Sequence, residues 1–172
     1  VTDDDFDDTA VNVSTGELTT AETLIASLAS SDNVIEGNVG GITVTTIGNV
    51  RRTAGNNAGR FWFEVYHRTS GGTETLIGTG SKTEYTEAET YTQFFDSALL
   101  QSQEFTSTDR IVLKFYGQTD AQTATFDFQF GGSQPIRTLF PVSAQLVPTT
   151  STSDTVLTDT ANFSGKLSGS DT

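Results

Sequence analysis

Three segments of the chain alternate apolar residues with polar or amphipathic ones at a period of two, which is typical of β-strands that bury one face. They are residues 60–68, 109–116 and 125–130, and in the last of them three Phe alternate with one Asp and one Gln. The inward positions of these three strands predict a core made of Phe61, Phe63, Val65, Ile111, Leu113, Phe115, Phe126, Phe128 and Phe130.

A glycine pair separates the first of these strands from another apolar run. Gly71-Gly72 can supply the positive φ angles that a tight reversal needs, and Leu76 and Ile77 follow it. The pattern predicts an antiparallel β-hairpin.

Periodicity is less decisive nearer the N-terminus. Leu24, Ile25 and Leu28 have the spacing of a short helix, but the Thr content around them fits an extended strand equally well, so both interpretations remain open. Residues 42–47 predict a further strand.

Between the hairpin and the second strong strand, residues 82–91 are polar and suit an exposed strand or loop. Two apolar pairs come next, Phe94-Phe95 and Leu99-Leu100. We expect both pairs to anchor this connection to the core.

Several short strands with Gly-rich turns and few helix signals predict an all-β fold, an antiparallel β-sandwich with extended N- and C-terminal segments. We expect an acidic arm over residues 1–16, the sandwich over 17–145, and a Thr/Ser-rich linker over 146–172 that leads to further modules. The chain starts at Val1 and contains no Met, so we expect a processed product or a piece of a longer protein.

The net charge of −13 disfavours nucleic acid and anionic membranes as partners. Part of it lies in the N-terminal arm, where like charges usually keep a segment solvated. A calcium contact is the weaker alternative, because hard cations take carboxylate oxygens, although the run lacks the spaced ligands and Gly of an EF-hand loop. The calcium candidates are Asp3, Asp4, Asp5, Asp7 and Asp8.

Candidate catalytic chemistry is sparse. The chain has no Cys, and His67 is its single histidine, for which a structural role is the usual one. Nucleophile-elbow, zinc-protease and phosphate-binding motifs are absent from the sequence. We therefore predict no catalytic residues, no cofactor and no enzymatic activity.

Large aromatic side chains also occupy the face opposite the predicted core. Trp62 and Tyr66 lie on the side of their strand that should meet water, and Tyr116 lies on the corresponding side of a second strand. We predict that the three form a subunit contact. The competing explanation is that a flanking segment of the same chain, residues 136–147, folds over them.

The order of four segments carries a resemblance. Phe61-Trp-Phe-Glu-Val-Tyr66, Gly71-Gly-Thr-Glu-Thr-Leu-Ile77, Thr108-Asp-Arg-Ile-Val-Leu-Lys-Phe-Tyr116 and Phe126-Asp-Phe-Gln-Phe130 follow one another. The series resembles a jelly-roll domain of the fibre, spike and other appendage proteins of tailed phages, and of virion proteins of some large DNA viruses. The resemblance covers residues 60–132 and extends back to about residue 17.

The resemblance implies a jelly-roll β-sandwich in an extracellular, non-enzymatic virion structural protein: a fibre, spike or capsid-decoration component. Its partners would be other virion proteins and copies of itself, as a homotrimer, on a phage capsid or tail. The alternative is a carbohydrate-binding jelly-roll module for a host-surface glycan, because Trp and Tyr rings can also stack on sugars.

Overall fold

The computed structural model describes residues 12–30, 36–84, 86–129, 137–140 and 161–162. Within these residues the regular elements are all strands, and there is no helix. The strands are β1 (Asn12–Leu18), β2 (Thr23–Ala29), β3 (Gly37–Val39), β4 (Thr43–Gly55), β5 (Gly59–Arg68), β6 (Glu74–Thr79), β7 (Thr92–Leu99), β8 (Gln103–Phe105), β9 (Arg110–Thr119), β10 (Ala124–Gln129), β11 (Arg137–Phe140) and β12 (Ala161–Asn162).

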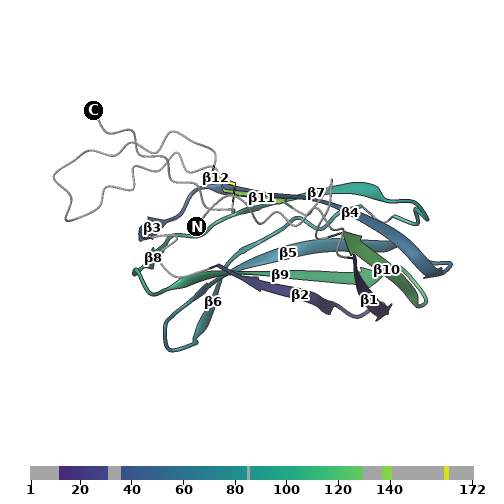
Figure 1. Ribbon diagram of the computed structural model, residues 1–172, viewed down its shortest axis with the longest axis horizontal. Coiled ribbons are helices and arrows are strands. Elements are labelled where there is room, and N and C mark those ends of the chain that lie inside the picture. Colours follow the sequence, from purple (N-terminus) through teal and green to yellow (C-terminus); the bar gives the residue numbers. More distant parts are fainter. Residues whose placement is uncertain (1–11, 31–35, 85, 130–136, 141–160, 163–172) are drawn as a thin grey trace.

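Two sheets face each other as layers (Figure 1). Sheet A has the order β1-β10-β4-β11-β12, and β7 also pairs with the long strand β4. Sheet B has the order β2-β9-β5-β6, and the short strands β3 and β8 pair at one end. Every pairing between these strands is antiparallel. The predicted all-β, jelly-roll-like antiparallel β-sandwich is confirmed.

The described strands extend beyond the predicted sandwich at both ends. β1 pairs with β10, so residues 12–16 belong to sheet A and not to an arm. β12 lies within the predicted C-terminal linker and pairs with β11. The polar sequence of β1, in which only Leu18 is buried, gave no alternation by which to recognise it. The calcium candidates of the acidic arm lie outside the described residues.

The segment that the sequence left open between helix and strand is extended. Leu24, Ile25 and Leu28 all lie in β2, which pairs with β9 along the edge of sheet B. The predicted hairpin is confirmed as β5 and β6, and of its two turn glycines only Gly72 has a positive φ, of 88°.

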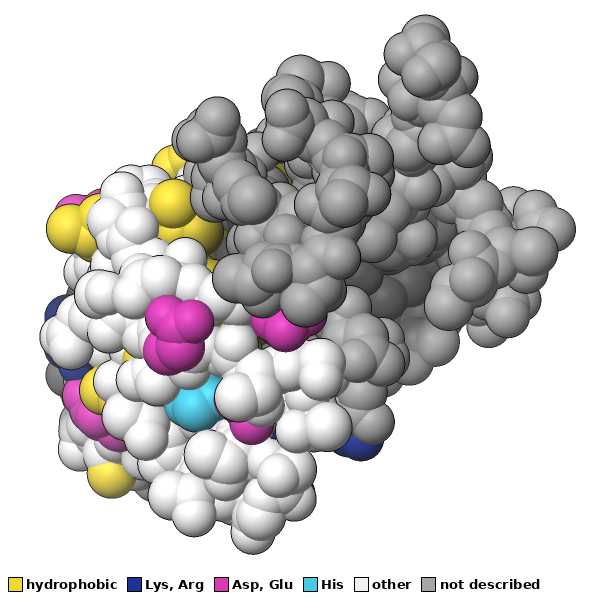
Figure 2. Space-filling view, turned by 90° about the vertical axis from the view of Figure 1, so that its left-hand side faces the viewer, with side chains coloured by type: hydrophobic (Ala, Val, Ile, Leu, Met, Phe, Trp, Pro, Cys, Tyr) yellow, Lys and Arg dark blue, Asp and Glu magenta, His cyan; other side chains and the backbone are white. Residues whose placement is uncertain are grey.

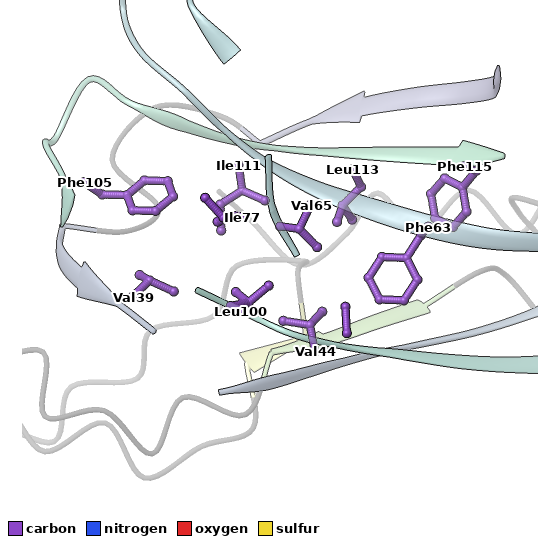
Figure 3. Close-up of a cluster of buried hydrophobic side chains, with 11 residues drawn as sticks. Val39, Val44, Phe63, Val65, Ile77, Leu100, Phe105, Ile111, Leu113 and Phe115 are labelled. Carbon is purple, nitrogen blue, oxygen red and sulfur yellow. The ribbon is translucent and has the colours of Figure 1, made fainter. Parts of the chain in front are cut away.

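The core lies between the two sheets, and every predicted core residue that the structure describes is buried; Phe130 lies outside the described residues. Side chains of sheet B, including Phe63 and Leu113, meet Val44 and Leu100 from the opposite layer (Figure 3). A second cluster is built from Phe rings in edge contact, with Phe61 and Phe128 centroids 4.8 Å apart. These rings supply the apolar bulk that the composition otherwise lacks.

Each of the two apolar pairs in the connection has one buried member and one exposed member. Phe94 and Leu100 enter the core, whereas Phe95 is 64% exposed and Leu99 is 66% exposed. Each pair therefore anchors the connection to the core through one member only, and its other member faces outward. Phe94 and Phe95 are neighbours within β7, and adjacent side chains of a strand point to opposite faces of the sheet.

A buried carboxyl group ties β7 of sheet A to sheet B. Asp96 is 1% exposed and points inward from β7. Its oxygens accept hydrogen bonds from the backbone N–H of Phe63 (3.3 Å), the N–H and hydroxyl of Ser81 (2.8 and 2.9 Å), and the N–H of Ser97 (2.8 Å). Gly80 permits this approach, since a Cβ there would lie 1.8 Å from an Asp96 oxygen. We call this group of contacts the Asp96 clasp.

We predict that Phe128→Ala lowers the free energy of unfolding by about 3–5 kcal/mol, because it removes a fully buried ring from a cluster of Phe side chains. Urea unfolding of the dilute chain, followed by circular dichroism, measures the loss. Phe95→Ala is the matched control, and it should change stability little, since that ring is mostly exposed. Equal losses in the two variants would contradict the assignment of faces.

Candidate functional site

The aromatic residues predicted as a subunit contact do lie together on the outer face of sheet B. Trp62 of β5 and Tyr116 of β9 are direct cross-strand neighbours. Their rings stack with centroids 5.7 Å apart and an interplanar angle of 11°. Tyr66 of β5 lies on the same face, two residues beyond Glu64.

Trp62 does not face water, however, because its own chain covers it. The indole is 2% exposed, with the ammonium group of Lys82 at 4.1 Å from the ring centroid. Lys82 also pairs with Glu22. The expectation of a solvent-facing Trp62 that needs a partner subunit is therefore corrected.

The cover comes from the segment that follows β6. This segment continues alongside β5, with hydrogen bonds from Gly80 N–H to Phe63 C=O and from Thr83 N–H to Phe61 C=O, both 2.8 Å. Lys82 itself has a φ of 64°, an uncommon conformation for a residue other than glycine. The flanking segment that the sequence offered as a cover, residues 136–147, is described only over 137–140, where it pairs with β4 in sheet A.

Tyr66 is held by a second set of contacts from the same chain. Its hydroxyl donates to Glu64 Oε2 at 2.6 Å, and the ammonium group of Lys114 lies 4.2 Å from its ring centroid. Lys114 in turn pairs with Glu74. Burial, followed by the hydrogen bonds to Glu64 and Tyr116, raises the pKa of Tyr66 well above its ordinary value. The phenol therefore stays protonated at physiological pH.

On this face, both aromatic residues of β5 are consequently held by contacts within the chain. Trp62 and Tyr66 each have a lysine of the same chain over the ring, and each lysine is paired with a glutamate. Cation–π contacts of this kind stabilise a fold by about 0.5–2 kcal/mol each. These contacts give Trp62 and Tyr66 a structural role in sheet B.

The single histidine also has a structural partner. His67 Nε2 lies 3.0 Å from Asp109 Oδ2, and the imidazole packs edge-on against Phe105 at 4.5 Å. Figure 2 shows this side chain at one end of the sandwich, between acidic groups. Asp109 Oδ2 also accepts the Thr106 N–H at 2.8 Å. That hydrogen bond and the contact with His67 lower the pKa of Asp109 to about 2.

Metal-binding groups are not assembled in the part of the chain that the structure describes, since it brings together no three His, Asp or Glu side chains. In the same residues, no helix is long and apolar enough to span a membrane.

The outer face of sheet A carries the largest exposed apolar groups, which sequence reasoning missed. Cross-strand pairing places Phe95 beside Ile47, Ser97 beside Thr45 and Leu99 beside Thr43. On the other side of β4, Leu139 of β11 pairs with Thr45. We call this set the sheet A strip: Thr43, Thr45, Ile47, Phe95, Ser97, Leu99 and Leu139. The doublets Phe94-Phe95 and Leu99-Leu100 were its signal, because only one member of a doublet within a strand can face the core.

The chain has only weak similarity to known proteins. No family model and no curated protein matches the chain. Among solved structures, the CBM22-1 xylan-binding domain of Paenibacillus barcinonensis Xyn10C is 16% identical, covering 69% of this chain and 90% of that domain with a TM-score of 0.31. The CBM22-1–GH10 modules of the Clostridium thermocellum endo-1,4-β-D-xylanase Xyn10B, complexed with xylohexaose, are 15% identical to this chain. The match covers 70% of this chain and 27% of that chain, with a TM-score of 0.29. No inference about function rests on either likeness.

We predict that Lys82→Ala exposes Trp62 to water. Trp62 is the only tryptophan, so its fluorescence emission should shift to longer wavelength and become more sensitive to acrylamide quenching. Lys114→Ala is the matched control, because it removes a cation from Tyr66 and not from Trp62. Identical spectra for all three proteins would show that Lys82 does not cover the indole.

The Asp109 contacts predict a specific pH dependence. The pKa of Asp109 falls from 3.8 to about 2 on folding, so the carboxylate stabilises the fold above pH 3.8 and loses this effect as the pH falls through about 2. Asp109→Asn should therefore lower Tm near neutral pH, and the gap to the native chain should close over that acidic range.

Asp120→Asn, at an exposed position of the loop between β9 and β10, is the control and should leave Tm unchanged at each pH. A gap for Asp109→Asn that persists at acidic pH would contradict the electrostatic origin of the effect.

Proposed function

We propose that this chain is a non-enzymatic structural domain of a virion appendage, as a fibre, spike or decoration component, that assembles with copies of itself on the outside of the particle. The sequence resemblance supports the virion context. One observation in the structure supports assembly: Phe95 and Leu99 stand largely exposed on the same face of β7.

Exposed apolar residues are common singly, but two large ones close together on one face of a strand are less so. Phe95 and Leu99 are separated on this face only by Ser97, and Ile47 adds apolar surface beside them. Burying such a group against another protein gains about 25 cal/mol for each Å² of apolar surface removed from water. A structural protein that assembles has a use for this surface.

The buried ionisable groups support a non-enzymatic role. The Asp96 oxygens accept hydrogen bonds from three residues of β5, β7 and the segment after β6. Asp109 is held by Thr106 and His67. Each group thus serves to connect strands, whereas a general acid or base needs access to a substrate proton.

Host-glycan binding has less support from the geometry. A sugar ring would stack on the face of an exposed aromatic side chain, and the face of Trp62 is already occupied by Lys82. Phe95 is exposed, but among its direct neighbours on this face only Gln93, along the strand, carries an amide that could orient a sugar, whereas the others are Ile47 and Ser97.

We predict that the intact chain self-associates in solution. Sedimentation equilibrium over a range of concentrations should give masses above the 18.4 kDa of one chain, approaching a multiple of it. A glycan array probed with the same protein should give no selective binding. A chain that stays monomeric up to its solubility limit would overturn the proposed function, and selective binding of a defined glycan by that monomer would favour the glycan-binding alternative.

A further inference from the structure

We infer that two copies of the chain meet through the sheet A strip, in an isologous contact whose two-fold axis passes between the two Ser97 residues. In this arrangement, Phe95 of each copy packs against Leu99 of the other. The inference rests on the proposed self-association and names the surface and symmetry by which it occurs.

The strip is held rigidly before any partner arrives. β7 pairs with β4 over its whole length, from Thr92 with Val50 to Leu99 with Thr43. On its inner side the Asp96 clasp fixes β7 against sheet B. Phe95 and Leu99 therefore stand at defined positions, and little backbone ordering is needed on association.

Charge favours a second copy at this face. The chain carries 22 acidic residues and a net charge of −13, so two copies repel wherever their carboxylates approach each other. Yet the outward positions of β4 and β7 hold no acidic residue: they are Thr43, Thr45, Ile47, Asn49 and Arg51 on β4, and Gln93, Phe95, Ser97 and Leu99 on β7.

The same property argues against other partners. Nucleic acid and anionic membranes would be repelled by the chain as a whole. A basic protein would gain most from a carboxylate-rich face, and the strip has none. The outer face of sheet B differs, since Glu64 and Lys114 lie opposite each other at its centre and Arg60 lies nearby.

The pattern of side-chain sizes is self-complementary under a two-fold axis. Phe95, Ser97 and Leu99 are successive outward positions, so a large group stands at about 7 Å on either side of a small one. Rotation about an axis at Ser97 and perpendicular to the strand places each Phe opposite a Leu. Both ends of the contact then have the same thickness, whereas a parallel arrangement would place Phe on Phe at one end and Leu on Leu at the other.

Cross-linking at the axis tests this geometry, because the chain contains no cysteine and Ser97→Cys introduces a single thiol. The Ser97 side chain is not needed for the Asp96 clasp, which uses the backbone N–H of that residue. Face-to-face sheets pack about 10 Å apart, so a bis-maleimide of comparable span should join two copies of this variant in high yield. Thr53→Cys, exposed on β4 outside the strip, is the control and should give little dimer.

One substitution within the strip and one control outside it test how much the strip contributes to the free energy of association. Phe95→Ser should weaken self-association at least tenfold in sedimentation experiments while leaving the thermal unfolding of the dilute chain nearly unchanged. Leu76→Ser is the matched control: Leu76 is 44% exposed on sheet B, and its replacement should leave association unchanged.

The possible outcomes are separable. If the native chain associates but Ser97→Cys cross-links no better than Thr53→Cys, or Phe95→Ser associates normally, the strip is not the contact and the proposed self-association stands. A trimer without this cross-link, the stoichiometry implied by the resemblance, would overturn the two-fold arrangement in the same way. If the native chain never associates, both the contact and the proposed function fail.

Discussion

The Asp96 clasp is the contact on which the arrangement of β7 depends. A buried carboxyl group is costly unless its oxygens are fully hydrogen-bonded, and here donors come from β5, from β7 and from the segment after β6. Because the donors of Phe63 and Ser81 belong to sheet B and to the segment beside it, Asp96 must point inward from β7 to reach them. The period of two then turns Phe94 and Ala98 into the core and leaves Phe95 and Leu99 outside.

The two outer sheet faces consequently have different characters. On sheet B, the chain covers its own large aromatic residue by placing Lys82 over Trp62, and paired charges surround it. On sheet A, Phe95 and Leu99 are left uncovered on a face whose β4 and β7 positions lack acidic residues. In a chain with a net charge of −13, this is the face at which a second copy would meet the least electrostatic opposition.

The sandwich and its core could be predicted from sequence because period-two alternation reports directly on a buried face, as it did for Phe61, Phe63 and Phe126. The cover over Trp62 could not, since it depends on the chain after β6 running on beside β5, a non-local pairing with no apolar pattern of its own. Alternation could have shown which member of Phe94-Phe95 faces the core had the boundaries of β7 been known. β1 was missed because its edge position buries a single side chain, Leu18.

Hydrogen–deuterium exchange of the intact chain at low and at high concentration tests most directly which outer face associates. The account predicts that exchange slows with concentration in peptides from β7 and from the first half of β4. Peptides from β5 and β9, which present the Trp62 face, should exchange at the same rate at both concentrations. Concentration-dependent slowing in β5 and β9, with none in β7 and β4, would contradict the account.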